Sequence, residues 1–180
     1  MSFRRLTPPV VVLTGVENSG KTTLAAALAG DLDWAHLPEA ARTDPAVTSG
    51  QVNTHDLQRL LAQHLHSLEH LRTTATPAIV CDTGPLVLDR WSSEAFGQPL
   101  EGALEAQRSV DLFLLCHTLP EWEPDPLRSL PRHEDRILHQ QRYIDHLESH
   151  RLPWAMVPAQ ALSQRIETAK ALLAHYTLLT

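Results

Sequence analysis

Short extended segments alternate along the chain with longer segments of helical periodicity. Residues 10–13, 78–81 and 112–116 are apolar at odd and even positions alike, as is typical of strands buried on both faces of a parallel sheet. Two further extended segments are expected at 34–38 and 154–157. The pattern therefore predicts five strands.

The segments between the strands carry apolar residues at helical spacing and predict helices at 21–32, 53–71, 133–149 and 163–176. Asn53 is the expected N-cap of the second helix. The expected buried faces are Leu24, Ala27 and Leu28, then Leu57, Leu60, Leu61, Leu65 and Leu68, then Ile137, Ile144 and Leu147, and finally Ile166, Ala169, Leu172, Leu173 and Tyr176. Strands that alternate with helices predict an α/β fold. Residues 119–132 hold four prolines and little apolar periodicity, which predicts a loop.

The composition fits one globular domain over residues 1–180, with 43% hydrophobic and 20% charged residues. The formal net charge of −6 argues against binding to nucleic acid or anionic membranes, because both require a basic surface. The sequence shows no signal segment and no apolar run of membrane-spanning length. Cys81 and Cys116 lie in predicted strands and are expected to be buried thiols. A cytoplasmic protein is expected.

A glycine-rich motif follows the first predicted strand and opens the first predicted helix. In that setting the backbone N–H groups of the turn form a nest for the phosphates of ATP or GTP. Lys21 is expected to reach the β- and γ-phosphates, and the Thr22 hydroxyl is expected to ligate Mg²⁺. The residues predicted to bind the nucleotide are Gly15, Glu17, Asn18, Ser19, Gly20, Lys21, Thr22 and Thr23.

Acidic residues follow two other predicted strands. Asp82 is placed to bind Mg²⁺ directly or through water, with a helix cap before Pro85 as the alternative. Glu39 is placed to accept the proton of an acceptor hydroxyl, while Arg42 would hold negative groups of the acceptor. Glu39 could equally be a solvated loop charge. Asp56 is a further candidate on the acceptor side.

The proline-rich loop and the start of the next helix carry arginines at spacings of four. Arg128, Arg132 and Arg136 could form a lid over residues 119–136 that clamps phosphate, the alternative being a solvated basic helix surface. Arg128 is favoured because it lies in the loop itself. Trp91 and Trp122 border these segments and could stack on a flat ring, although packing is the alternative for both.

Together these motifs resemble the ribosylnicotinamide kinase domain of the NadR type and related small P-loop ATPases. The resemblance rests on residues 15–23, 38–42, 79–83, 111–115 and 121–128, and the Trp-x-x-Asp-x-Leu-Arg segment, with Asp125, is its most distinctive part. It implies a five-stranded parallel sheet, with the Asp82 strand beside the phosphate-loop strand. It also implies transfer of the ATP γ-phosphoryl to the 5′-hydroxyl of nicotinamide riboside, with Arg165 as a stacking partner near the adenine.

The chain differs from that family at three positions on the acceptor side, where it has Ala40, Thr43 and Gly84. The sequence therefore predicts an Mg²⁺- and ATP-dependent kinase of a nucleoside-like small molecule and leaves two alternatives. One is a nucleoside monophosphate kinase, and the other is a slow ATPase or nucleotide-switched binding module. The oligomeric state is not predicted.

Overall fold

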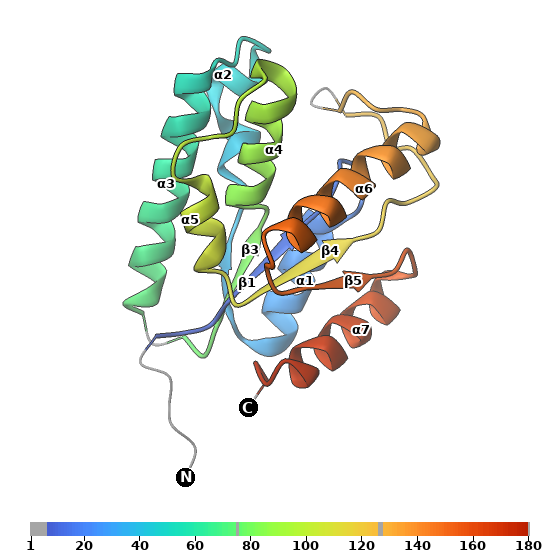
Figure 1. Cartoon of the computed structure of the whole chain (residues 1–180). Helices are drawn as coiled ribbons and strands as arrows, with labels where there is room; N and C mark the ends of the chain where they lie inside the picture. The colour runs from blue at the N-terminus through green and yellow to red at the C-terminus, as the bar shows by residue number, and fades with distance from the viewer. Residues whose placement is uncertain (1–6, 75, 126–127, 180) are drawn as a thin grey trace.

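The computed structural model describes residues 7–74, 76–125 and 128–179, and its centre is a five-stranded parallel sheet in the order β2-β3-β1-β4-β5 (Figure 1). The strands are β1 Val10–Thr14, β2 Ala35–Leu37, β3 Ile79–Asp82, β4 Leu112–Cys116 and β5 Trp154–Val157. Each lies within one residue of its predicted position. The α/β class is confirmed, and the Asp82 strand does lie beside the phosphate-loop strand. Pro126 and Leu127, which contribute to the predicted lid and to the resemblance, lie outside the described residues.

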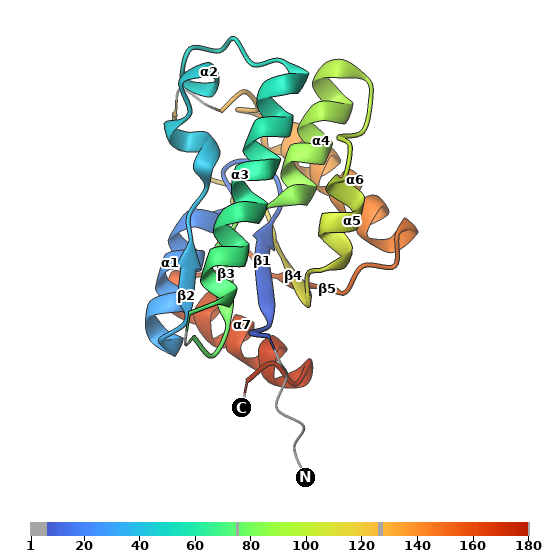
Figure 2. The same ribbon diagram turned by 90° about the vertical axis from the view of Figure 1, so that its left-hand side faces the viewer.

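Helices cover both faces of the sheet (Figures 1 and 2). They are α1 Lys21–Leu32, η1 Ala40–Thr43, α2 Pro45–Thr48, α3 Thr54–Arg72, α4 Pro85–Phe96, α5 Ala103–Arg108, α6 His133–Ser149 and α7 Leu162–His175. One hydrophobic core joins one face of the sheet to residues of α3, α4 and α6. A second core joins the opposite face to α1 and α7. Because successive strand residues point to opposite faces, both cores are built from the same apolar strands.

Four of the helical segments in the described part of the chain, η1, α2, α4 and α5, were not predicted. Both η1 and α2 span only four residues, too few for a helical period to show. In contrast, α4 carries recognisable end signals, with Pro85 in its first turn and Gly97 in a left-handed conformation (φ 71°) just after its end.

The predicted buried faces of α3 and α6 are wrong at Leu65 and Ile137, which are 37% and 38% exposed. On α6 the inward positions belong largely to polar residues, including Arg136 and Gln140. The Gln140 side chain accepts a hydrogen bond from the Thr118 amide at 2.9 Å. Polar groups are buried here because the irregular segment after β4 supplies partners for them. Residues 117–132 contain no helix or strand among those the structure describes, which agrees with the predicted loop, and both cysteines are buried free thiols.

Candidate active site

The carboxyl ends of β1, β2 and β3 meet at one edge of the sheet, where a cavity of about 560 Å³ opens. Ligand sites of open parallel sheets lie at this edge. The cavity walls bring together most of the predicted site residues, namely Gly15, Glu17, Asn18, Ser19, Gly20, Lys21, Thr22, Thr23, Glu39, Arg42, Trp91, Asp125, Arg128 and Arg165. The helices α4 and α6 complete the walls with Arg90, Glu94, His139 and Tyr143, none of which was predicted.

Two glycines give the phosphate loop its shape. Gly15 has a φ of 128°, and a Cβ there would lie 2.8 Å from the carbonyl oxygen of Cys116. Gly20 has a φ of 68°, and a Cβ there would lie 2.5 Å from the Arg165 guanidinium. Any larger side chain would be strained at both positions because of the positive φ, and at Gly15 it would also clash with the backbone of Cys116. The loop can therefore hold its backbone N–H groups around an anion at the start of α1.

The Lys21 ammonium lies over this loop. Its Nζ atom donates to the carbonyl oxygen of Val16 at 2.7 Å. Burial lowers the pKa of Lys21, and the carboxylates of Glu39 and Asp82 oppose that effect. The lysine is thus held at the phosphate loop by a carbonyl, where its positive charge can bind phosphate.

Arg42 connects the acid after β2 to the phosphate loop and to the lid. Its guanidinium lies 3.1 Å from Glu39, 3.6 Å from Asp125 and 3.3 Å from the Thr22 hydroxyl. Burial raises the pKa of Glu39, while Lys21 and Arg42 act in the opposite direction. The structure therefore places a carboxylate of increased basicity beside the phosphate loop and orients it with an arginine.

Asp82, at the end of β3, is 2% exposed, and neither of its carboxylate oxygens has a hydrogen-bond partner among the described residues. A buried carboxylate without hydrogen bonds is costly in an apolar setting. A cation would supply such a partner, and the Asp82 carboxylate and the Thr22 hydroxyl carry oxygen donors of the kind that Mg²⁺ prefers. Thr22 lines the cavity, whereas Asp82 lies behind the residues that line it. Within the described ranges no cluster of three or more histidine, cysteine or acidic side chains could hold a metal ion, so a bound nucleotide would have to complete the shell.

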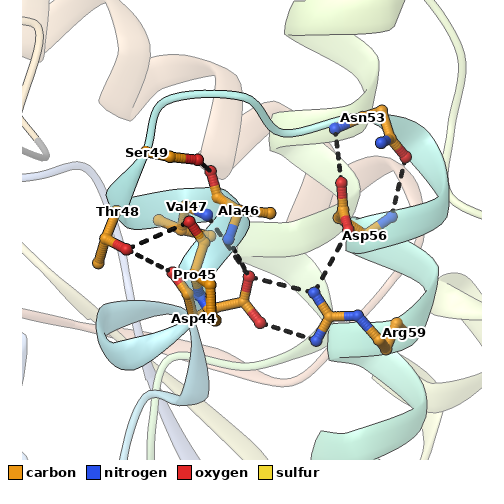
Figure 3. Close-up of polar contacts among 9 residues, drawn as sticks. All are labelled: Asp44, Pro45, Ala46, Val47, Thr48, Ser49, Asn53, Asp56 and Arg59. Atoms are coloured by element: carbon orange, nitrogen blue, oxygen red, sulfur yellow. Dashed lines mark hydrogen bonds and ion pairs between the residues drawn. The ribbon is translucent and has the colours of Figure 1, made fainter.

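The segment that carries Glu39 and Arg42 is fixed by an ion pair at its far end (Figure 3). The Asp44 carboxylate caps α2 through the amides of Ala46 and Val47 and pairs with Arg59 at 2.7 and 3.1 Å. The hydrogen bond from Arg59 is the main cause of the lowered pKa of Asp44. The network ties the wall formed by η1 and α2 to α3.

Asp56, a predicted acceptor contact, belongs to this network and does not line the cavity. Its carboxylate accepts from the Asn53 amide at 3.1 Å, while the Asn53 side chain accepts from the Asp56 amide at 3.2 Å. This reciprocal pair is a capping box. It confirms Asn53 as the N-cap of α3 and gives Asp56 a structural role.

Phosphate-loop side chains hold the lid loop in place. Asn18 Oδ1 accepts from the amide of Glu123 at 3.2 Å and from the Arg128 guanidinium at 3.0 Å. Glu17 accepts from the amide of Ser129 at 2.8 Å. Of the lid arginines, Arg128 is the one that reaches the cavity, and its contacts run directly to the loop that would bind phosphate.

The other two lid arginines do not reach the cavity. Arg132 has a side chain that is 72% exposed and pairs with Glu134 and Asp135. Arg136 is fully buried, and its guanidinium lies 5.2 Å from the centre of the Trp122 ring. That guanidinium donates to Thr118 Oγ1 and to the carbonyl oxygens of Leu119, Pro120, Leu130 and Pro131. Arg136 and Trp122 therefore form the support on which the lid loop rests, and they are structural.

Replacing Arg136 by methionine should lower the free energy of unfolding by about 3 kcal/mol, because several buried carbonyl groups lose their donor. The measurement is urea denaturation, with a lower midpoint at an unchanged slope. Arg132→Met is the matched control, four residues away and exposed, and should change stability by less than about 0.5 kcal/mol. Equal effects of the two substitutions would contradict the structural role of Arg136.

Arg165, on α7, is 3% exposed, and its guanidinium donates to the carbonyl oxygen of Ser19 at 2.8 Å. Arg165 therefore holds the backbone of the phosphate loop in place. The predicted stacking of Arg165 on the adenine remains a prediction. Trp91 lies on the α4 wall of the cavity beside Arg90. Arg90 contacts Glu94 at 2.8 Å, and Glu94 in turn contacts His139 of α6 at 3.4 Å. These contacts join α4 to the helix after the lid.

Comparisons with known proteins identify the family and the fold. The model of the AAA_28 family, an AAA domain, matches residues 10–165. No curated protein matches the sequence. None of the helices in the described part of the chain is long and apolar enough to span a membrane.

Several solved structures share the fold, two of them kinases by name. Deoxyadenosine kinase from M. mycoides has 13% identity and a TM-score of 0.59, over 92% of this chain and 98% of that one. Thymidylate kinase from Candida albicans has 12% identity and a TM-score of 0.66, over 97% and 94%. A NadR protein in complex with NR has 19% identity and a TM-score of 0.71 over 94% of this chain. The chain spans 51% of that NadR protein.

Proposed function

The chain belongs to the AAA_28 family of AAA domains, and on this premise we propose that it is a kinase. It would transfer the γ-phosphoryl group of ATP to a hydroxyl of a nucleoside-like acceptor, with nicotinamide riboside as the first candidate. One observation carries the proposal: Glu39, a carboxylate of raised pKa, shares a single cavity with the phosphate loop and is paired with Arg42 at 3.1 Å.

In the proposed reaction the phosphate loop binds the donor, and Lys21 neutralises charge on the β- and γ-phosphates. Glu39 accepts the proton of the acceptor hydroxyl as its oxygen attacks the γ-phosphorus, and the bond from that phosphorus to the β–γ bridging oxygen breaks. Arg42 orients Glu39 and borders the path of the transferred group. Arg128, held against Asn18 at 3.0 Å, adds positive charge from the lid and helps to exclude water.

Thr22 and Asp82 are the residues that would hold Mg²⁺, which would supply charge neutralisation at the phosphates. Asp82→Asn should weaken Mn²⁺ binding in the presence of ADP by about 10–100-fold, the range for residues that orient a metal or its bound water. Electron paramagnetic resonance of Mn²⁺ measures this without turnover. The control is Asp33→Asn, at the left-handed C-cap of α1 (φ 54°), a conformation that asparagine tolerates. Equal Mn²⁺ affinities for the two variants would exclude Asp82 from the metal site.

A specific observation also favours a nucleoside monophosphate as acceptor. Arg90 lines the cavity from α4, with its guanidinium paired to Glu94 at 2.8 Å. Arg42 lies in the same cavity, and two arginines suit an acceptor that already carries a phosphate. This second candidate predicts that a monophosphate is phosphorylated and its parent nucleoside is not.

A panel of acceptors tests the proposal. ADP release from Mg²⁺·ATP should rise above the acceptor-free rate with nicotinamide riboside or another nucleoside. Stimulation by thymidine monophosphate or deoxyadenosine monophosphate, without stimulation by the parent nucleosides, would select the second candidate. If no compound raises the rate, the kinase proposal fails and a slow ATPase or a nucleotide-switched binding module would account for the phosphate loop.

A further inference from the structure

A second, smaller cavity of about 30 Å³ lies beside the active-site cavity and is called the side cavity below. Five of its lining residues also line the active-site cavity, namely Glu39, Ala41, Thr83, Val87 and Trp91. The remaining walls come largely from α3 and α4. The side cavity therefore extends the acceptor half of the site next to the proposed base, and no residue of the phosphate loop lines it.

His64, on the inner face of α3, closes the side cavity. The residue is 9% exposed, so nine-tenths of it is removed from solvent. Its ring makes no hydrogen bond or ion pair with any residue that the structure describes. Neither ring nitrogen of His64 is among the fully buried, partnerless atoms of the described residues, so the imidazole edge is accessible from the side cavity. A small polar molecule in that cavity can therefore supply the hydrogen-bond partner that the protein does not.

The room in front of the ring exists because position 84 has no side chain. A Cβ at Gly84 would lie 3.6 Å from both Cε1 and Nε2 of His64 and 3.2 Å from a methyl group of Val12. The backbone of Gly84 is extended, with φ 172°, so its conformation does not demand glycine. The consequence of glycine here is space, and a larger side chain would cover the imidazole.

The ring and the volume limit what can bind. Burial lowers the pKa of His64 to about 4, so the imidazole is neutral near pH 7, with one nitrogen as donor and the other as acceptor. A group that both donates and accepts is its best complement. A water molecule needs roughly 10–15 Å³ on this measure, so 30 Å³ admits a few atoms and excludes an aromatic ring.

We propose that the side cavity binds a small uncharged polar group of the acceptor, a sugar hydroxyl or a ring carboxamide, and that His64 is its hydrogen-bonding partner. His64 would then determine specificity, since a site built to hydrogen-bond a group rejects acceptors that lack it. The identification of the occupant as part of an acceptor rests on the proposed function.

The test compares acceptors that differ only in the candidate group. To test for a bound hydroxyl, ribonucleosides are compared with their 2′- and 3′-deoxy forms. To test for a bound carboxamide, nicotinamide riboside is compared with nicotinic acid riboside. His64→Phe should lower kcat/KM about 10–100-fold for the acceptor that carries the group and leave the acceptor without it unchanged. The KM for ATP should not change. His64→Gln, which retains a donor and an acceptor, should recover part of the preference.

The control is His66→Phe, an exposed position on the same helix, which should leave the preference intact. A readout without turnover is the ¹⁵N resonances of the His64 ring, which should shift when the nucleoside is added without ATP. If this shift occurs but no phosphoryl transfer does, the inference stands and the proposed function fails. Two outcomes would overturn the inference and show that the side cavity holds only water. One is that transfer occurs and His64→Phe keeps the wild-type preference between the paired acceptors. The other is that no ¹⁵N resonance of the His64 ring shifts.

Discussion

Replacing Lys21 by alanine should lower kcat for phosphoryl transfer on the order of 10²–10³-fold, as expected when one preorganised donor to developing charge is removed. The ammonium is held over the phosphate loop by the carbonyl of Val16 at 2.7 Å, and its burial lowers its pKa. The melting temperature should not fall, because the ammonium is placed for ligand charge and does not pack in the core. Steady-state kinetics and thermal melts of the same samples measure both.

The sequence has one other lysine, Lys170, which pairs with Asp31 at 2.8 Å on the surface of α7. Lys170→Ala is therefore a matched control and should retain wild-type turnover. Wild-type turnover in Lys21→Ala would exclude the Lys21 ammonium from the mechanism. A collapse of its melting temperature would show that the loss of activity reflects unfolding.

Replacing Glu39 by glutamine should lower kcat about 10²–10⁴-fold, the usual contribution of a general base, while the KM for ATP changes little. Only the ionised carboxylate can accept a proton, so activity is lost as the pH falls through the pKa of Glu39. Burial raises that pKa. In the pH profile of kcat/KM, the midpoint of the acidic limb should thus lie at a pH above the ordinary glutamate pKa of about 4.3. This limb should disappear in Glu39→Gln.

Glu105→Gln is the control, because the Glu105 side chain on α5 is 84% exposed. It should preserve both the rate and the acidic limb. An acidic limb that persists unchanged in Glu39→Gln would assign it to another group, and full activity in that variant would exclude Glu39 as the base.

The donor half of the site could be predicted because its signals are local in sequence. A buried strand, a glycine-rich turn and a helix follow one another without interruption, and Gly15 and Gly20 are required by the backbone conformation and close contacts of that turn. Asp82 and Glu39 could be predicted for a related reason. Each follows a recognisable strand of a parallel sheet, and the carboxyl ends of such strands meet at one edge.

The roles of the lid arginines, Arg90 and His64 could not be predicted, because they depend on contacts between segments that are distant in sequence. Spacing alone does not separate Arg128, which reaches Asn18, from Arg136, which is buried under the lid loop. Apolar periodicity also gives the wrong buried face for a helix whose inward positions are polar. For this reason Ile137 was predicted to be buried and Arg136, which is buried, was not. Arg90 was missed together with α4, and His64 was missed because nothing in its sequence neighbourhood shows that Gly84 leaves its ring open.

If the protein transfers a phosphoryl group from ATP to an acceptor hydroxyl within one cavity, the most direct measurement follows the transferred group itself. ATP labelled in the γ-phosphoryl is incubated with Mg²⁺, the protein and nicotinamide riboside, and the products are separated. The expected result is that the label appears in the acceptor monophosphate and that both Lys21→Ala and Glu39→Gln suppress its appearance. Label found only in inorganic phosphate, at a rate that the acceptor panel leaves unchanged, would contradict it.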